Sequence, residues 1–237
     1  GIFDSQGNYY VPSVAGCKIV KFDSNGTFAY ELGSTCAQNS TTSFSFFAGI
    51  MAVDFDDNLY VTDLNNSQYI KKFDSAGNYI GYIDAGSDVY NDGIHSMVVD
   101  GKGNLYVGTS HSPRVLVFDS SGNQTNVWNS AGSGDGQFNG LDADVTLDGQ
   151  GYVYVRNGGR VQKFSAAGTY LSQWSISGSG QFVISKNNTV YAQNGNRIDI
   201  YTLNGDYLEG FNVPMSWMQP IVGTNDITGE VTINDGV

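Results

Sequence analysis

Residues 148–174 read DGQGYVYVRNGGRVQKFSAAGTYLSQW, and this stretch decides the fold. Apolar and polar residues alternate along it, and Gly168 follows the aromatic Phe164 by four residues. Alternation of this kind is typical of β-strands, and a glycine at such a step supplies the positive φ of a hairpin turn. The stretch therefore predicts antiparallel strands joined by a tight turn.

The same pattern recurs along the whole chain. Segments such as GNYYV, DNLYV, GNLYV and GYVYV centre on residues 10, 60, 106, 154, 191 and 232, with spacings of 50, 46, 48, 37 and 41. After each of the first five copies comes an aromatic residue, then a glycine four positions later; these aromatics are Phe22, Phe73, Phe118, Phe164 and Tyr201. The second unit reads as four strands, GIMAVDF, NLYVTDL, YIKKFD and NYIGYID. Four antiparallel strands in a unit of about 45 residues is the geometry of a propeller blade.

The linkers carry a family resemblance. SAGSGDGQFNG (130–140), followed by a strand, DGQGYVYVRN and RVQKFSAAGTYL, resembles the NHL-repeat pattern, and ISGSGQF repeats the linker in shortened form. The resemblance covers nearly the whole chain. It departs where the family usually has a proline after Gln-Phe-Asn, because Gly140 and Leu141 stand there. With the six repeat copies counted above, the resemblance predicts an all-β, six-bladed propeller whose sixth blade is incomplete within this chain.

We expect a single domain over residues 1–237, with blades at 1–36, 44–86, 93–130, 138–176 and 180–213 and a partial sixth at 218–237. The last segment supplies the first two strands of the sixth unit but no outer hairpin. Either the chain continues in a longer protein, or the open edge accepts a strand from another subunit. Unpaired edges invite strand addition, and a head-to-tail contact that does not close produces a filament.

Composition limits the partners. The formal net charge is -12 with 11 basic residues, which argues against binding of nucleic acid or an anionic membrane surface. No apolar run approaches the length of a membrane span, so we expect no membrane insertion. The chain begins at Gly1 without a signal-type region, so we expect a mature or excised product.

The two cysteines suggest an oxidising compartment. Cys17 precedes the outward strand of a hairpin that turns near Asn25, and Cys36 follows the return strand, so the two are expected to meet in a disulfide. Glycosylation sequons occur at Asn25, Asn39, Asn65, Asn123 and Asn187, with Asn39 the best placed in a Ser/Thr-rich loop. We expect an extracellular or cell-surface location.

Candidate chemistry is sparse, and no catalytic residue is assigned. Some NHL-like propellers are lyases with a histidine-ligated zinc, but His95 and His111 are too few for that pattern. Asp142 and Asp144 interrupt an inner strand at i and i+2 and are the candidate ligands for a cation such as Ca²⁺, with solvated channel carboxylates as the alternative.

Two further sets of residues recur from blade to blade. Aspartates just after the inner strands are interpreted as turn caps; these are Asp54, Asp100, Asp148 and Asp226. Large residues six positions after each turn glycine suggest packing between blades, with a sugar-stacking platform as the alternative; these are Leu32, Ile83, Trp128, Trp174 and Phe211.

These observations favour a non-catalytic extracellular propeller that acts as a structural, adhesive or assembly module. Its expected partners are other copies of the chain, or another surface protein or glycan. The rival interpretation is a propeller lyase or hydrolase that uses channel carboxylates and a bound cation.

Overall fold

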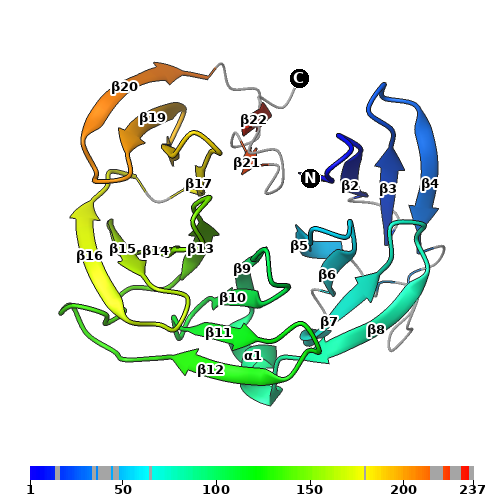
Figure 1. Ribbon diagram of the computed structural model, residues 1–237, viewed down its shortest axis with the longest axis horizontal. Helices are drawn as coiled ribbons and strands as arrows, with labels where there is room; N and C mark the ends of the chain where they lie inside the picture. The colour runs from blue at the N-terminus through cyan, green and yellow to red at the C-terminus, as the bar shows by residue number, and fades with distance from the viewer. Residues whose placement is uncertain are drawn as a thin grey trace.

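The chain folds into a β-propeller of five four-stranded blades (Figure 1). The computed structural model describes residues 1–13, 17–33, 36, 44, 48–63, 66–178, 180–213, 221–224 and 231–234. In every blade the strands pair in chain order and antiparallel, so each blade is a simple meander. The four strands of a blade run from the centre of the ring to its rim.

The strand bounds follow the repeat. Blade one holds β1 (Ile2–Phe3), β2 (Tyr9–Ser13), β3 (Lys18–Phe22) and β4 (Phe28–Leu32). Blade two holds β5 (Ala48–Val53), β6 (Leu59–Asp63), β7 (Asn66–Phe73) and β8 (Tyr79–Asp84). Blade three holds β9 (Ile94–Val99), β10 (Leu105–Thr109), β11 (Val115–Phe118) and β12 (Gln124–Trp128). Blade four holds β13 (Asp144–Leu147), β14 (Val153–Asn157), β15 (Arg160–Phe164) and β16 (Tyr170–Ser175). Blade five holds β17 (Phe182–Ile184), β18 (Thr189–Asn194), β19 (Arg197–Thr202) and β20 (Tyr207–Asn212).

The four strands predicted for the second unit are confirmed as β5 to β8. The hairpin predicted in blade one is also confirmed, because Phe22 pairs with Phe28 across the turn and Ile19 pairs with Leu32. The short helix α1 (Ser87–Asp92) follows blade two and was not predicted. In the described part of the chain no helix has the length and apolar character of a membrane span.

The expected count of blades is corrected from six to five. The sequence predicted to begin a sixth blade forms a separate two-stranded sheet, β21 (Ile221–Thr224) paired with β22 (Val231–Asn234). This sheet lies between blade five and blade one (Figure 1), and β21 contacts β17, β18 and β1. Within the described ranges β22 pairs only with β21, so the structure shows no four-stranded sheet at this position.

The hydrophobic core lies between the blades. One cluster joins Tyr60 and Ile70 of blade two to Leu105 and Leu116 of blade three, and similar clusters join blade one to two, three to four and four to five. A lone four-stranded blade would expose both of these faces to water. Each blade is therefore stabilised by its neighbours, as expected of a repeat architecture.

Between blades, large side chains pack onto turn glycines. A Cβ added to Gly77 would lie 3.1 Å from Leu32 Cδ2, and one added to Gly122 would lie 3.1 Å from Ile83 Cγ1. Trp128 covers Gly168 in the same way and stacks on Phe164 with ring centroids 5.1 Å apart. Trp174 covers Gly205. The prediction of packing between blades is confirmed for these four residues.

The two ends of the five-bladed array lack this contact. Phe211 of β20 is the fifth residue of the series, but its side chain is 42% exposed, against 8% for Trp128. At the other end, Gly26 of blade one has φ +80°, and no described atom comes within 4 Å of a Cβ placed there. Among the described residues, one end therefore presents an exposed aromatic ring and the other presents an uncovered turn glycine.

The predicted disulfide between Cys17 and Cys36 is present, with Cα atoms 5.1 Å apart. Cys17 is buried against blade one and joins a hydrophobic cluster with Ile19 and Phe44. The bond closes the base of the β3–β4 hairpin. In the chain-entropy model a loop of this size contributes about 3 kcal/mol of stability.

Candidate functional site

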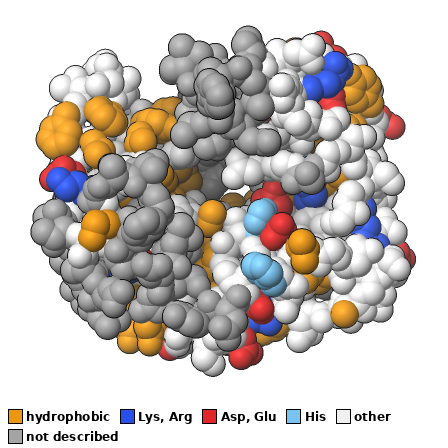
Figure 2. Space-filling model, turned by 180° about the vertical axis from the view of Figure 1, so that it is seen from behind, with side chains coloured by type: hydrophobic (Ala, Val, Ile, Leu, Met, Phe, Trp, Pro, Cys, Tyr) orange, Lys and Arg blue, Asp and Glu red, His pale blue; other side chains and the backbone are white. Residues whose placement is uncertain are grey.

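The innermost strands of all five blades surround a central cavity of about 280 Å³. Its walls include Ile2 of β1, Met51 of β5, Met97 of β9, Val145 of β13 and Phe182 of β17. The inner strands lie close together around this cavity: β9 contacts both β5 and β13, and β13 also contacts β17. The cavity is therefore the channel of the propeller. Figure 2 shows acidic and histidine side chains gathered beside the hollow at the centre of one face.

Three ionisable residues, His95, Asp142 and Asp144, lie close together at one end of the channel, which is called the channel mouth below. His95 and Asp144 both line the cavity, and His95 Nδ1 lies 3.5 Å from Asp142 Oδ1. The side chain of His95 is 34% exposed and that of Asp142 is 48% exposed, so water reaches both. Asp144, the first residue of β13, is buried. His95, the second residue of β9, therefore faces the channel.

Asp144 has an unusual environment for a carboxylate. Burial raises the pKa of Asp144 to about 6. Two effects oppose this rise: the nearby charges of His95 and Arg156, and a hydrogen bond that the Phe182 backbone N–H donates to Oδ2 at 3.0 Å. Arg156 is the strand partner of Asp144, and its guanidinium donates to the carbonyl oxygens of Ser177 and Gly180. A carboxyl group that titrates near pH 6 beside a histidine is suited to proton transfer.

Asp142 and Asp144 are close in sequence but differ in placement. Asp142 precedes β13 and is exposed, whereas Asp144 lies inside the strand and lines the cavity. Among the described residues, no group of three or more His, Cys, Asp or Glu side chains is placed to hold a metal ion. Ca²⁺ takes six to eight oxygen ligands. A cation at Asp142 and Asp144 therefore stays a prediction.

Sequence reasoning missed Arg156 and Ser96. Ser96 Oγ donates to the carbonyl oxygen of Ala143 at 3.0 Å and accepts the Val145 N–H at 2.8 Å, so it ties β9 to β13 beside the site. A signal for Arg156 exists in the repeat alignment, because Thr62 and Gly108 occupy the equivalent positions. A charged residue at one buried position of a repeat indicates a local role.

The other predicted residues lie away from the channel. His111 has φ +46°, and its Nδ1 lies 3.0 Å from the carbonyl oxygen of Asp92 in a loop of blade three. Asn25, Asn123 and Asn187 are exposed. Asn39 and Asn65 lie outside the described residues. Glycosylation at all five sequons stays a prediction.

The repeated aspartates cap turns, as predicted. Asp54 Oδ1 accepts the backbone N–H groups of Asp56 at 3.0 Å and Asn58 at 2.8 Å. The buried Tyr60 hydroxyl donates to Asp54 Oδ2 at 3.1 Å. Asp100 and Asp148 repeat these contacts, whereas Asp226 lies outside the described residues. Asp4, which the sequence reasoning did not single out, has the same role.

The class of protein that the fold defines is the β-propeller. No family model matches the chain, and no curated protein matches it. Among solved structures the chain is similar to a streptogramin B lyase, with a TM-score of 0.68 at 14% identity over 98% of this chain and 74% of that one.

Two other structures are similar to a comparable degree. A protein of unknown function from Bacteroides caccae gives a TM-score of 0.61 at 13% identity, covering 90% of this chain and 76% of that one. U3-55K gives 0.64 at 10% identity, covering 100% of this chain and 87% of that one. At these identities the likeness establishes the propeller fold alone, and membership of the NHL-repeat family stays a prediction.

Proposed function

We propose that this chain is a non-catalytic extracellular β-propeller that serves as an assembly module. In this proposal it is an NHL-type propeller whose open edge, at the two-stranded sheet of β21 and β22, accepts a strand from a neighbouring copy of the chain. One observation carries the proposal: Phe211 is exposed at one end of the five-bladed array, and, within the described residues, Gly26 is not covered by a large side chain at the other end.

The packing of the complete blades supports this reasoning. At each of the four junctions a large side chain covers a turn glycine of the next blade. A strand of a neighbouring copy added beside β22 would lie between these two ends and cover both Phe211 and Gly26. Burying an aromatic side chain of this size contributes about 1.5–3 kcal/mol. Both contacts would be made by one added unit.

Strand pairing gives the added strand a site on the backbone of β22. β22 has one partner, β21, among the described residues, and an unpaired strand edge is a template for another chain. Joining one copy to the next through this edge is a head-to-tail contact. Such contacts produce an open polymer unless the rotation between copies closes a ring, so the expected assembly is a filament or a surface layer.

The disulfide is consistent with the extracellular part of the proposal. Cys17 and Cys36 are joined, and disulfides persist chiefly in oxidising compartments. The five sequons belong to the same proposal, and their use is tested by the mass of the protein from its natural source.

Sedimentation velocity over a range of protein concentrations tests the assembly. We expect species larger than a monomer to grow with concentration, and Phe211→Arg to abolish them because it places a charge in the new contact. Leu171→Arg is the matched control, since Leu171 is 46% exposed on β16, an outer strand of blade four that lies away from the end of the five-bladed array. A wild-type chain that remains monomeric at the highest concentration contradicts the proposal, as does equal loss in both variants.

A second candidate function has one observation in its favour. The buried Asp144, with its pKa raised to about 6, lies at the channel mouth with His95 and Asp142. This arrangement suits a lyase or hydrolase that transfers a proton in the channel. Turnover of a lactone or ester panel that is lost in Asp144→Asn, together with a stoichiometric bound cation, would favour this enzyme. Absence of both from the purified protein favours the assembly module.

A further inference from the structure

A second and larger cavity, of about 550 Å³, lies at the opposite end of the channel strands. The residues that line it come from the turns after β5, β9, β13 and β17, whereas His95 lies at the start of β9. The cavity is thus separate from the His95 site. Its volume is within the range typical of small-molecule sites, about 300–1,000 Å³.

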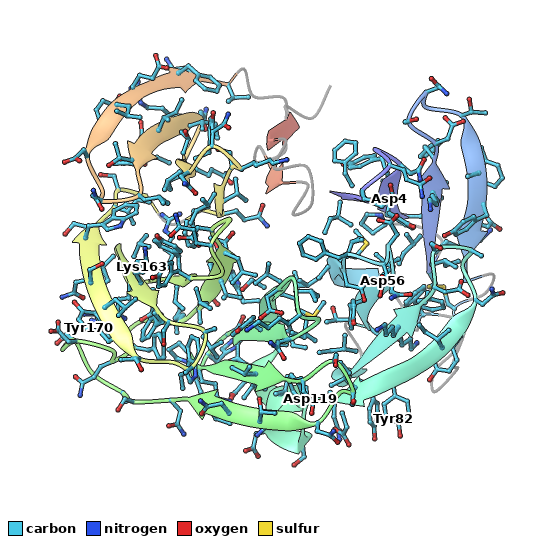
Figure 3. The ribbon with its side chains drawn as sticks, in the orientation of Figure 1. Asp4, Asp56, Tyr82, Asp119, Lys163 and Tyr170 are labelled. Carbon is cyan, nitrogen blue, oxygen red and sulfur yellow. A yellow bond between two sulfur atoms is a disulfide. The ribbon has the colours of Figure 1, made fainter. Side chains whose placement is uncertain are left out.

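The cavity has an apolar wall. Val98 and Val99 of β9, Leu147 of β13 and Ile184 of β17 line it, together with Phe55 from the turn after β5. The Phe55 side chain is 54% exposed, and its ring packs beside Gly101 of the next turn. Figure 3 marks Asp56, the neighbour of Phe55. A large aromatic ring held open to solvent at a cavity rim offers a contact surface to an apolar ligand.

Two lysines give the cavity its charge. Of the 11 basic residues in the chain, seven form ion pairs with carboxylates, and Arg156 and Arg160 donate to backbone carbonyl oxygens. Lys163, labelled in Figure 3, is one of the paired group. The remaining two are Lys102 and Lys186, for which the described residues supply no ionic partner, and both line this cavity.

The two carboxylates at the cavity form no ion pair with these lysines. Asp100 and Asp148 line it, but both are buried. Asp100 accepts hydrogen bonds from the backbone N–H groups of Lys102 and Asn104, each at 2.9 Å, and from the Asn104 side chain. Asp148 accepts two turn N–H groups and the Tyr154 hydroxyl. Their oxygens accept hydrogen bonds within the turns, and Asp148 Oδ2 pairs with Lys163 at 3.7 Å, so neither carboxylate forms an ion pair with Lys102 or Lys186.

We propose that this cavity binds a small amphiphilic anion, a molecule with an apolar body and a carboxylate head. The body would lie against Phe55 and the aliphatic wall, and the head would lie between Lys102 and Lys186. In a chain of net charge -12, the placement of both unpaired cations at one cavity favours an anionic ligand over a neutral one. The sequence alone does not predict this site, because the site is assembled from turns of four blades.

Calorimetric titration with decanoate tests the proposal, with acetate and decyl maltoside as probes of the head and the tail alone. We expect saturable binding of one decanoate per chain, and at least tenfold weaker binding by acetate and by decyl maltoside. The double variant Lys102→Gln/Lys186→Gln is expected to bind decanoate at least tenfold more weakly, and Phe55→Ser is expected to weaken it as well.

The matched control is Lys18→Gln/Arg197→Gln. It removes the same two charges from partly exposed residues that pair with Glu31 and Asp199, so it should bind decanoate as the wild type does. Repeating the titration in Phe211→Arg keeps the result independent of assembly. No saturable decanoate binding, equal binding by decyl maltoside, or equal losses in the two double variants would overturn the proposal.

Discussion

Replacing Gly168 with alanine tests the packing between blades, with Gly26→Ala as its matched control. Both glycines occupy the same position of the repeat, and their φ values are +87° and +80°. They differ in one respect. A Cβ at Gly168 would overlap the indole ring of Trp128, whereas a Cβ at Gly26 would meet nothing within 4 Å.

The magnitudes follow from this difference. Alanine in the left-handed region costs about 1–2 kcal/mol, and this cost is shared by both variants. Overpacking against a neighbour that cannot retreat costs about 1–3 kcal/mol more, and only Gly168→Ala incurs it. Trp128 also stacks on Phe164, with ring planes 28° apart, and lies against Tyr106, so it has little room to move.

Thermal unfolding of the monomer, followed by far-UV circular dichroism, measures the difference. A chain of this size loses about 2–4 °C of Tm per kcal/mol, so Gly168→Ala should melt about 2–12 °C below Gly26→Ala. Equal melting temperatures for the two variants would refute the reasoning. They would mean that the contact between Trp128 and the turn of blade four does not contribute to the stability of the fold.

Three further outcomes are expected. Burial raises the pKa of Asp144 above its unfolded value, so the free energy of unfolding falls as pH rises from about 4 to 6, by about 3 kcal/mol over these two pH units. Asp144→Asn should remove this part of the pH dependence. Urea unfolding at each pH measures this, and an unchanged slope would count against it. Replacing Cys17 and Cys36 with serine should cost about 2–4 kcal/mol, and alkylation of the unreduced wild type should add no mass. Gly108→Ala should lower the yield of folded protein, because its Cβ would overlap the carbonyl oxygen of Ala143 in the next blade, and normal expression and melting would contradict this.

Much of the fold was readable because propellers repeat. The Phe164 and Gly168 pattern predicted the hairpins, and the large residue six positions after each glycine predicted where blades touch. The disulfide followed from hairpin geometry, since Cys17 and Cys36 flank one strand pair. These features depend on local pattern, which is the part of a fold that one sequence records directly.

The rest depended on contacts between distant residues. The two strands expected within residues 218–237 are present as β21 and β22, but counting them as a partial sixth blade was wrong, because they form a separate two-stranded sheet beside five complete blades. The environment of Asp144 was hidden because its burial and the charge of His95, 49 positions earlier, come from neighbouring blades. Lys102 and Lys186 look like ordinary turn residues until the ring brings their turns to one cavity.

Cryo-electron microscopy of the concentrated protein tests the central claim most directly. The account predicts polymers in which β21 and β22 are joined by a strand of a neighbouring copy, with Phe211 buried and Gly26 covered. A monomer in which Phe211 stays exposed and no chain occupies the edge of β22 would contradict it. So would a sixth blade completed by the same chain.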